Sequence, residues 1–337
     1  MAQTTTTTTE KKAILGKVLV IGGNGFLGHH IVKLLFSSWS ATVAVIDLKC
    51  ERNRLDGAQY FEADITNADA VKAVFDQFRP DIVNVEGTKV IVDACLHAGV
   101  KVLVYTSSAS ILSDNKTDLR NANENFPVIR APTRPTEDIV LKANRTGEHN
   151  LLTAAIRPAG IFGEGDGMTT KHMVQIYVDG RTNVQVGDNN NLFDFTYVGN
   201  VAHAHLLAAL RLLATYRLHP TVPLDTERVD GEAFLVTNDS PMYFWDFART
   251  MWRAAGRDAG LEGVWKLPVD VGILLGFLSE RIVYSSMTRY YNINKAKERL
   301  GYRPIVSLEE GVNRAVQWCL EDNKQLGAAA AARKKQQ

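Results

Sequence analysis

Three things are scarce in this sequence of 337 residues, and each scarcity excludes a class of protein. There are only three cysteines, Cys50, Cys95 and Cys319. Their wide spacing fits neither a disulfide framework nor a zinc site, and it indicates a reducing compartment or a cytosolic face. Lysine plus arginine total 38 and aspartate plus glutamate 37, so a net charge of +1 gives no electrostatic reason to expect a nucleic-acid partner. No apolar run is long enough to cross a membrane.

The segment 271–278, Val-Gly-Ile-Leu-Leu-Gly-Phe-Leu, comes nearest to such a run. Its length fits a core helix, and a helix that dips into a bilayer surface is the alternative. The first twelve residues contain six consecutive threonines and no apolar core of a secretory signal. We expect a disordered tail there, and another over the alanine-rich residues 323–337.

A glycine-rich turn follows the first predicted strand. Residues 18–21 are Val-Leu-Val-Ile, and glycines come at 22, 25 and 28 before an apolar helical segment. This order predicts a dinucleotide site, in which Gly22 allows the turn, Gly25 lets backbone approach phosphate and Gly28 lets the helix pack on the strand. The helix N-terminus offers N–H groups and partial positive charge to the pyrophosphate. An ordinary strand-to-helix loop is the alternative.

Two acidic residues follow the next predicted strands. The apolar strand 42–47 ends at Asp47, about where the fingerprint places a carboxylate that binds the adenosine ribose hydroxyls. A carboxylate there repels a 2′-phosphate and favours NAD, whereas Arg52 and Arg54 leave NADP open. Asp64, at the end of a short third strand, is a candidate for contact with the adenine edge.

The order of strands and helices predicts the fold class. Helical patterns over 67–78 and 84–97 alternate with strands over 80–83 and 100–105. This alternation indicates an α/β fold, a Rossmann-type doubly wound parallel sheet with right-handed crossovers. Ligands bind such sheets at the carboxyl ends of the strands. The polar segment 112–136 is predicted to be a loop.

We expect the chain to divide into a cofactor domain and a smaller C-terminal substrate lobe. A capping-box pattern at Ser307 predicts a last helix that reaches about Glu321. The expected parts are a disordered tail (1–12), an NAD(P)-binding Rossmann domain (13–159 with 192–214), a substrate lobe (160–191 with 215–322) and a second disordered tail (323–337).

Several stretches of the sequence resemble the extended short-chain dehydrogenases. The matching stretches are Ile21–Gly28, Asn84–Thr88, Tyr105–Ser108, Arg157–Gly163 and Asp194–His205. Within that family the sequence most resembles the 3β-hydroxysteroid dehydrogenase/isomerase branch. The runs 195–205 and 291–304 resemble more closely its sterol-4α-carboxylate 3-dehydrogenases (decarboxylating). The resemblance extends from about Ala13 to Glu321.

The resemblance implies an activity and a set of site residues. The family oxidises a sterol 3β-hydroxyl group by hydride transfer to NAD(P), and the resulting β-keto acid loses its 4-carboxylate as carbon dioxide. A Tyr-x-x-x-Lys pair on one helix carries the acid–base step, and a serine or threonine holds the substrate oxygen. Ser108 matches that serine. The residues expected at the cofactor are Gly22, Gly25, Phe26, Leu27, Gly28, Asp47, Asp64, Ile65 and Pro158. No metal site is expected.

The sequence departs from the family at the catalytic pair. The Tyr-x-x-x-Lys pair should precede the segment 139–144, but Glu137 joins directly to Asp138, as if a turn of helix had been removed. A second segment is missing between Val83 and Asn84, where the family has a longer strand end and a loop near the cofactor. A missed exon, a splice variant or a genuine loss of catalysis would each produce this pattern.

Three tyrosines could be considered as substitutes, and each has a structural interpretation. Tyr291 and Lys295 have the required spacing but lie in a C-terminal helix motif of the family. Tyr105 ends a buried strand, which favours packing over proton transfer. Tyr197 is expected near the site but behind the residues that touch the ligand.

Two other kinds of residue are not expected to act in catalysis either. Lys142 lies four residues after Asp138 on a short helix, so a surface ion pair is expected. His203 and His205 are two residues apart on a predicted helix, where their side chains face different sides and do not fit metal ligation.

Three functions follow from these interpretations. The first is an NAD(P)-dependent 3β-hydroxysteroid or sterol dehydrogenase of sterol biosynthesis. The second is a non-catalytic NAD(P)-binding sensor or complex partner, and the third is a sugar-nucleotide epimerase or dehydratase. The ending Lys334-Lys335-Gln-Gln resembles a signal that retrieves proteins to the endoplasmic reticulum. With a sterol substrate it favours the cytosolic face of that membrane, as a peripheral protein, and a cytoplasmic location is the alternative. A homodimer and contact with other sterol-biosynthesis enzymes are left open.

Overall fold

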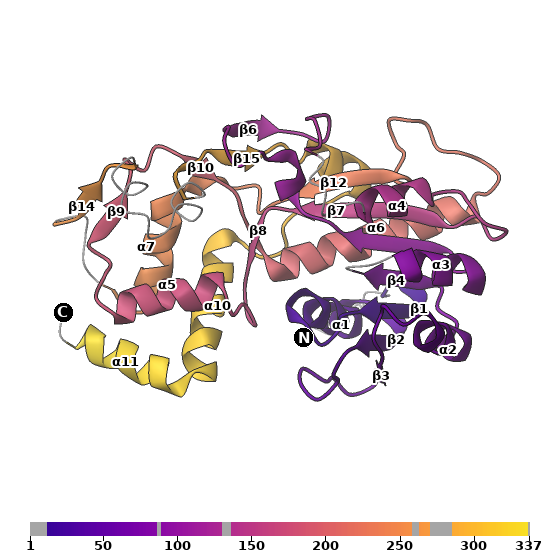
Figure 1. The fold of residues 1–337 in the computed structure, drawn as a ribbon, viewed down its shortest axis with the longest axis horizontal. Helices are drawn as coiled ribbons and strands as arrows, with labels where there is room; N and C mark the ends of the chain where they lie inside the picture. The colour runs from indigo at the N-terminus through magenta and orange to yellow at the C-terminus, as the bar shows by residue number, and fades with distance from the viewer. Residues whose placement is uncertain (1–11, 86–88, 130–135, 258–262, 270–284, 336–337) are drawn as a thin grey trace, which may run out of the picture.

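The computed structural model describes residues 12–85, 89–129, 136–257, 263–269 and 285–335. They form a large parallel sheet with helices on both faces, and beside it a smaller part built of helices and short sheets (Figure 1). The apolar run 271–278 and most of the predicted N-terminal tail lie outside the described residues. No helix within the described ranges is long and apolar enough to cross a bilayer.

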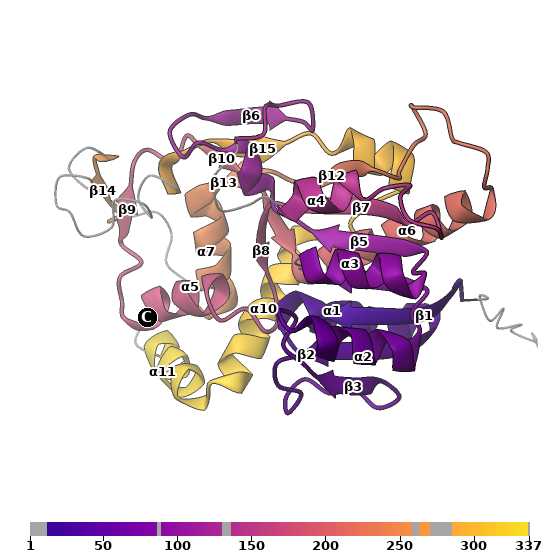
Figure 2. The same ribbon diagram turned by 45° about the vertical axis from the view of Figure 1, so that its right-hand side comes forward.

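Seven parallel strands form the large sheet, in the order β12-β7-β5-β4-β1-β2-β3 (Figure 2). Their bounds are β1 (Ile14–Ile21), β2 (Ser40–Asp47), β3 (Gln59–Glu62), β4 (Ile82–Val85), β5 (Val102–Thr106), β7 (Leu152–Pro158) and β12 (Glu232–Val236). The strand order reverses its direction between β1 and β4, and such a reversal opens a crevice at the carboxyl ends of the strands. The predicted Rossmann-type doubly wound sheet is confirmed.

Helices cover both faces of the sheet because successive strand residues point to opposite sides and both sides are apolar. Val18 and Val20 pack toward one group of helices, whereas Leu19 and Ile21 pack toward the other. The first group is α1 (Phe26–Ser38) and α6 (Val198–Arg217), and the second is α2 (Ala68–Phe78), α3 (Lys89–Ala98) and α4 (Thr136–Lys142).

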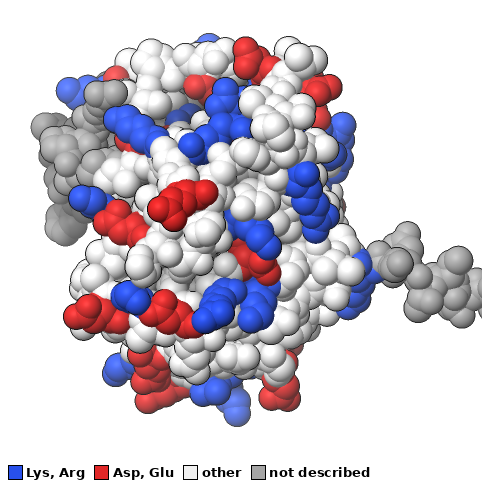
Figure 3. Space-filling view, turned by 90° about the vertical axis from the view of Figure 1, so that its right-hand side faces the viewer, with Lys and Arg blue, Asp and Glu red and all other residues white. Residues whose placement is uncertain are grey.

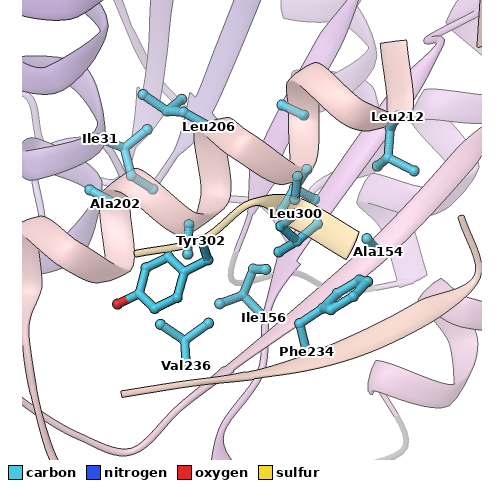
Figure 4. Packing of buried hydrophobic residues seen from close by; sticks show 14 of the residues in the cluster. Ile31, Ala154, Ile156, Ala202, Leu206, Leu212, Phe234, Val236, Leu300 and Tyr302 are labelled. Atoms are coloured by element: carbon cyan, nitrogen blue, oxygen red, sulfur yellow. The ribbon is translucent and has the colours of Figure 1, made fainter. Parts of the chain in front are cut away.

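A segment near the C-terminus packs against α6 and the large sheet. Ala296 and Leu300 of a π-helical turn, η2 (Ala296–Leu300), are buried together with Tyr302 against residues of α6 and of the sheet (Figure 4). The hydroxyl group of Tyr302 donates a hydrogen bond to the carbonyl oxygen of Thr237 at 2.9 Å. This contact fixes the C-terminal motif beside the end of β12.

The smaller part has its own aromatic core. Its helices are α5 (Thr169–Val178), α7 (Phe244–Ala254), α10 (Leu308–Asp322) and α11 (Lys324–Lys334). Its short strands are β6 (Leu119–Ala122), β8 (Gly160–Phe162), β9 (Val184–Val186), β10 (Leu192–Phe193), β11 (Phe195–Tyr197), β13 (Met242–Tyr243), β14 (Trp265–Leu267) and β15 (Arg289–Tyr291). The rings of Phe195 and Phe247 stack with centroids 3.5 Å apart.

Three predictions about elements were wrong. Asn84 does not start a helix but lies in β4, which pairs with β1 and β5 and so keeps a central strand in the sheet. The predicted loop 112–136 contains β6, because β15 supplies a partner strand from far along the chain. The predicted tail from residue 323 contains helix α11, with Leu326 buried against the smaller core.

The expected division of the chain also changes at one point. Residues 215–322 were predicted to belong to the substrate lobe, but β12 within this range is the edge strand of the large sheet, paired with β7. The sequence did not predict β12, because a strand of five residues shows too little periodicity to indicate which sheet it joins.

Candidate active site

A cavity of about 1540 Å³ lies at the carboxyl ends of the strands, where the strand order reverses. It is lined by all ten residues for which the sequence predicted cofactor or substrate contact, namely Gly22, Gly25, Phe26, Leu27, Gly28, Asp47, Asp64, Ile65, Ser108 and Pro158. They end or follow five different strands of the sheet, β1, β2, β3, β5 and β7. Parallel strands end at the same edge, and this edge brings residues from distant parts of the sequence together.

The β1–α1 turn is shaped so that its backbone can approach a ligand closely. Gly22 has φ +71°, a left-handed conformation that favours glycine. A Cβ added at Gly28 would lie 2.2 Å from the carbonyl oxygen of Gly22, so only glycine fits there. Helix α1 begins at Phe26, and its N-cap residue, Gly25, has no side chain that could accept from the N–H groups of the first turn. The N–H groups of the first turn therefore fit an anion such as a pyrophosphate.

Asp47 and Asp64 are both held in place by hydrogen bonds. The carboxylate of Asp47 accepts from the backbone N–H of Asn24 at 3.0 Å and of Leu48 at 2.8 Å. Asp64 accepts from the backbone N–H and the hydroxyl group of Thr66, and these bonds lower the pKa of Asp64. A carboxylate has about four acceptor positions, so each group retains capacity for hydroxyl or amine donors of a ligand.

Asn84 is an unsatisfied polar residue at the centre of the crevice. It lies between Val20 of β1 and Val104 of β5, and it is 1% exposed. Neither its side-chain nitrogen nor its oxygen has a hydrogen-bond partner among the residues that the structure describes. A buried polar group without partners is costly. The position fits a ligand group that both donates and accepts, such as a ribose hydroxyl or a carboxamide.

Ser108 is the N-cap residue of a short 3₁₀ turn, η1 (Ala109–Leu112), and its hydroxyl oxygen accepts from the backbone N–H of Ser110 at 3.2 Å. Behind it, His205 Nδ1 lies 2.9 Å from the carbonyl oxygen of Val201, and Nε2 lies 2.8 Å from the hydroxyl group of Thr106. A carbonyl only accepts, so Nδ1 carries the proton and Thr106 donates to Nε2. Burial lowers the pKa of His205 to about 4, which leaves a neutral ring behind the cavity wall.

The catalytic pair is absent from the described part of the cavity wall. Tyr105 is the one tyrosine among the described lining residues, and no described lysine lines the cavity. Tyr197 donates to the carboxylate of Glu164 at 2.7 Å, and burial followed by this contact raises the pKa of Tyr197, which keeps the phenol protonated and so unable to take up a proton. Lys295 binds Glu232 at 2.7 Å on another face. The predicted surface pair of Lys142 with Asp138 is confirmed at 3.8 Å.

Two features of the site were missed by the sequence analysis. Glu137 and Arg157 form a buried pair, with Arg157 Nε and Nη2 donating to the two carboxylate oxygens at 3.0 and 2.5 Å. Arg289 lines the cavity from β15 and contacts Ser113 and Asn115. The burial of Arg157 could be suspected from its place in an apolar strand, whereas Arg289 begins a strand of three residues. The partners of neither arginine can be inferred from sequence spacing.

Charge on the outer surface gives no sign of a macromolecular ligand on the face in Figure 3, where basic and acidic side chains are interspersed. This agrees with the net charge of +1.

Two family models match the chain. The 3-beta hydroxysteroid dehydrogenase/isomerase family matches residues 69–269, and the NAD dependent epimerase/dehydratase family matches residues 18–84. The sterol-4-alpha-carboxylate 3-dehydrogenase, decarboxylating, of Saccharomyces cerevisiae is 36% identical over 353 positions, which take in 90% of this chain and 98% of that protein. The Mus musculus protein of the same description is 32% identical, with 89% and 90% covered.

Solved structures resemble the fold as a whole. The UDP-glucose 4-epimerase of Thermotoga maritima has a TM-score of 0.65 at 21% identity, covering 91% of this chain and 99% of that one. The UDP-glucose 4-epimerase of Thermus thermophilus, solved in complex with NAD, has a TM-score of 0.64 at 20% identity, covering 90% and 98%. Identities this low support the fold alone.

The alignment with the yeast protein also bears on the missing segments. The alignment has 353 positions, which is more than the 337 residues of this chain, although only 90% of the chain is aligned. The relative therefore has residues within the aligned region that this chain lacks, in agreement with the loss of segments predicted from the sequence. The family model covers more than half of the chain, and both relatives exceed 30% identity over most of it. The chain belongs to the 3-beta hydroxysteroid dehydrogenase/isomerase family of extended short-chain dehydrogenases.

Proposed function

We propose that this chain is an NAD-dependent 3β-hydroxysterol dehydrogenase of sterol biosynthesis, with NADP as the alternative cofactor. Its substrate would be a 4α-carboxysterol, whose 3-keto product loses the carboxylate as carbon dioxide. The observation that carries the proposal is the single cavity lined by the glycine turn, Asp47 and Ser108. The names of the yeast and mouse relatives support the substrate class.

The residues of the turn fit the cofactor. The N–H groups at the start of α1 would hold the pyrophosphate, and Asp47 would accept hydrogen bonds from the adenosine ribose. Asp64 and Ile65 would lie at the adenine, and Pro158 and Asn84 toward the nicotinamide half. When bound, NAD supplies the acceptor for the hydride that leaves the sterol C3. This arrangement leaves hydroxyl binding and proton transfer to the protein.

The opposite end of the cavity fits an apolar alcohol. Ser108 would hold the sterol oxygen, and Ile111, Val128 and Ile129 line the cavity near it. The hydroxyl proton has to leave as the hydride is transferred. No described residue of the cavity wall replaces that tyrosine and lysine, so the proton would pass to solvent. General acid–base catalysis contributes about 10²- to 10⁴-fold, and turnover should fall below that of intact relatives by a factor of this order.

A second function is favoured by the absence of that pair from the described cavity wall. A non-catalytic protein that binds NAD(P), as a sensor or as a partner in a sterol-enzyme complex, needs the glycine turn and Asp47 but no proton acceptor. The third function, a sugar-nucleotide epimerase or dehydratase, has support from the fold and from the epimerase/dehydratase model over residues 18–84. The yeast and mouse relatives, both above 30% identity, carry sterol dehydrogenase names instead.

The cellular setting belongs to the same proposal. A sterol substrate and the ending Lys334-Lys335 support a peripheral position on the cytosolic face of the endoplasmic reticulum, with a cytoplasmic protein as the alternative. The division into an NAD(P)-binding domain, with β12 added, and a C-terminal substrate lobe is proposed with it. A homodimer and contacts with other enzymes of the pathway are further parts of this setting.

Titration and turnover together test the proposal. Purified protein would be titrated with NADH by fluorescence, and then given NAD and a 4α-carboxysterol beside the yeast relative. Binding with slow turnover supports the dehydrogenase, and binding with no product even in a single turnover supports the non-catalytic protein. No binding of NADH contradicts both. A rate equal to that of the relative would show that the missing pair is dispensable.

A graft supplies the matched control. A Tyr-x-x-x-Lys segment of the family pattern would be inserted between Glu137 and Asp138, where the sequence indicates the loss. Turnover should rise toward that of the relative, and the same insert with phenylalanine in place of its tyrosine should not raise it.

A further inference from the structure

One end of the smaller part carries several cations that no described acidic residue pairs with. These cations come from α7, β14 and the end of α11, and they are Arg253, Lys266, Arg333, Lys334 and Lys335. Arg333 is half-buried and the other four are exposed. Two acidic residues of the same end form ion pairs with other arginines, Asp179 with Arg181 and Asp246 with Arg249. This end therefore has a local excess of positive charge, although the net charge of the chain is only +1.

Two glycines show that the end of α11 lies against the ends of α5 and α7. A Cβ added at Gly180, just after α5, would overlap the guanidinium group of Arg333, and one at Gly256, just after α7, would lie 3.0 Å from Cδ of Lys334. Figures 1 and 2 both show these three helices at one end of the molecule, beside β9 and β14. The C-terminal end of a helix contributes only about half a negative elementary charge, so the excess there stays positive.

An exposed aromatic side chain lies on the same end. Trp265 of β14 stands opposite Val184 of β9, and its backbone N–H donates to the carbonyl oxygen of Asn183 at 2.7 Å. Trp265 is 77% exposed and Val184 is 44% exposed. Val184 follows Gly180 by four residues, which span at most about 15 Å of extended chain. The indole and the cations of α11 thus belong to one surface.

The combination of an exposed indole with unpaired cations narrows the choice of partner. Tryptophan is enriched at membrane–water interfaces, where its ring lies at the level of the headgroups, and lysine and arginine are attracted to anionic lipids. Cations alone would suit an acidic protein equally well, and the indole among them favours a bilayer. A second copy of the chain would bring like charges together across the contact.

We propose that this surface, called here the α11–β14 surface, binds an anionic lipid bilayer. It consists of Arg253, Trp265, Lys266, Arg333, Lys334 and Lys335. The indole and Val184 would enter the headgroup region while the cations lie against anionic headgroups. The inference rests on the proposed function in one respect, because it names the surface that would make the proposed peripheral contact with a membrane.

Vesicle binding tests the proposal without sterol and without catalysis. The full chain would be sedimented with vesicles of phosphatidylcholine alone and of phosphatidylcholine with phosphatidylserine. It should bind the anionic vesicles more tightly, with an affinity that falls as the salt concentration rises. Arg253→Gln/Lys266→Gln/Lys334→Gln should weaken this binding by about 100-fold, at about fivefold per charge. Trp265→Ser should weaken it by about tenfold, because an apolar side chain no longer leaves water.

Two control variants match these changes elsewhere on the molecule. Lys33→Gln/Lys89→Gln/Lys116→Gln removes the same number of exposed charges from α1, α3 and the segment before β6. Leu224→Ser removes an apolar side chain that is 70% exposed. Both variants should bind anionic vesicles as the native protein does.

Three results would contradict the inference. They are equal binding of the native protein to both kinds of vesicle, binding to neither kind, and equal losses in the two triple variants. A dimer that dissociates only in the triple variant of the α11–β14 surface, seen by sedimentation velocity, would show that this surface joins two copies instead. Should that variant not fold, the lipid and salt dependence of the native protein and Trp265→Ser decide.

NADH titration of each variant separates this inference from the proposed function. All variants should bind NADH as the native protein does, because the α11–β14 surface lies outside the residues that line the cavity. A native protein that binds anionic vesicles but not NADH would contradict the proposed dehydrogenase and leave the inference standing. Binding of NADH without binding of vesicles would do the reverse.

Discussion

Gly28 shows how one missing side chain shapes the cofactor turn. A Cβ there would lie 2.2 Å from the Gly22 oxygen and 2.7 Å from the Gly23 Cα, and both are backbone atoms. Gly28→Ala should therefore open the turn, weaken NADH binding by more than about tenfold and cost about 1–3 kcal/mol of stability, as overpacking does. Fluorescence titration and urea unfolding would measure both effects. Gly167→Ala is the control, because its Cβ meets nothing within 4 Å.

Asn84 leads to a prediction in which stability and binding change in opposite directions. Leucine has the same branched shape as asparagine and no polar atoms, so Asn84→Leu removes two unsatisfied buried groups. The ligand-free protein should gain roughly 1 kcal/mol and melt at a higher temperature. The further rise in melting temperature produced by NADH should shrink, because the amide no longer meets the cofactor.

Asn84→Asp keeps the shape of the side chain but buries a charge. Its melting temperature should therefore be lower than that of the native protein. A lower melting temperature for Asn84→Leu would show that the amide is already satisfied, for example by ordered water.

Site residues could be predicted where they lie at the carboxyl end of a predicted strand. Gly22, Asp47 and Ser108 follow predicted strands, and parallel strands end together, so their meeting in one cavity could be inferred from the sequence. Arg289 could not, because its contacts Ser113 and Asn115 are 176 and 174 residues away. No periodicity connects side chains across such a separation.

At the scale of elements, a buried ion pair joins α4 to the sheet, beside the apolar contact of Val140. This helix has only seven residues, and Glu137 anchors it to Arg157 of β7. Arg157→Met should destabilise the protein by about 3–5 kcal/mol, because it leaves a buried carboxylate without its partner. The double variant Glu137→Leu/Arg157→Met should recover most of the loss, since no charge is then buried.

Urea unfolding of the single and double variants would measure this coupling. Lys142→Ala, which removes an exposed partner 3.8 Å from Asp138, should change the stability by less than about 1 kcal/mol. Equal losses in the single and double variants would mean that the pair contributes shape rather than charge compensation.

Strands were predicted less well than helices where the chain is short or altered. Helix α2 carries apolar residues at helical spacing and was predicted within a residue, with Asn67 accepting from the N–H groups of Asp69 and Ala70 as its cap. Strand β4 was predicted to end too early, at Val83, because Asn84 is polar and the family motif places it at the start of a helix. Its neighbours β1 and β5 supply the pairing that keeps it extended.

For the molecule as a whole, Asp194 connects the smaller sheet to the wall of the cavity. It lies between β10 and β11, and its carboxylate accepts from the backbone N–H of Tyr291 at 2.8 Å, two residues after Arg289. Burial raises the pKa of Asp194 to about 7, against the effect of hydrogen bonds from Tyr291 and Thr237. The folded protein therefore binds a proton at this site more tightly than the unfolded chain, whose aspartate has a pKa near 3.9.

The sign of the pH effect follows from this difference. The stability that Asp194 contributes is fully present below about pH 4 and is lost as the pH rises toward 7. Asp194→Asn stays neutral at every pH, so its stability relative to the native protein should increase between pH 4 and pH 8, to an advantage of about 2–4 kcal/mol. His205, whose pKa burial lowers to about 4, contributes stability that is lost as the pH falls below 6.5. That contribution is the same in both proteins and cancels in the comparison. Urea unfolding of the two proteins across this range would measure the difference, and a difference that does not change with pH would mean that Asp194 is ionised in the folded state.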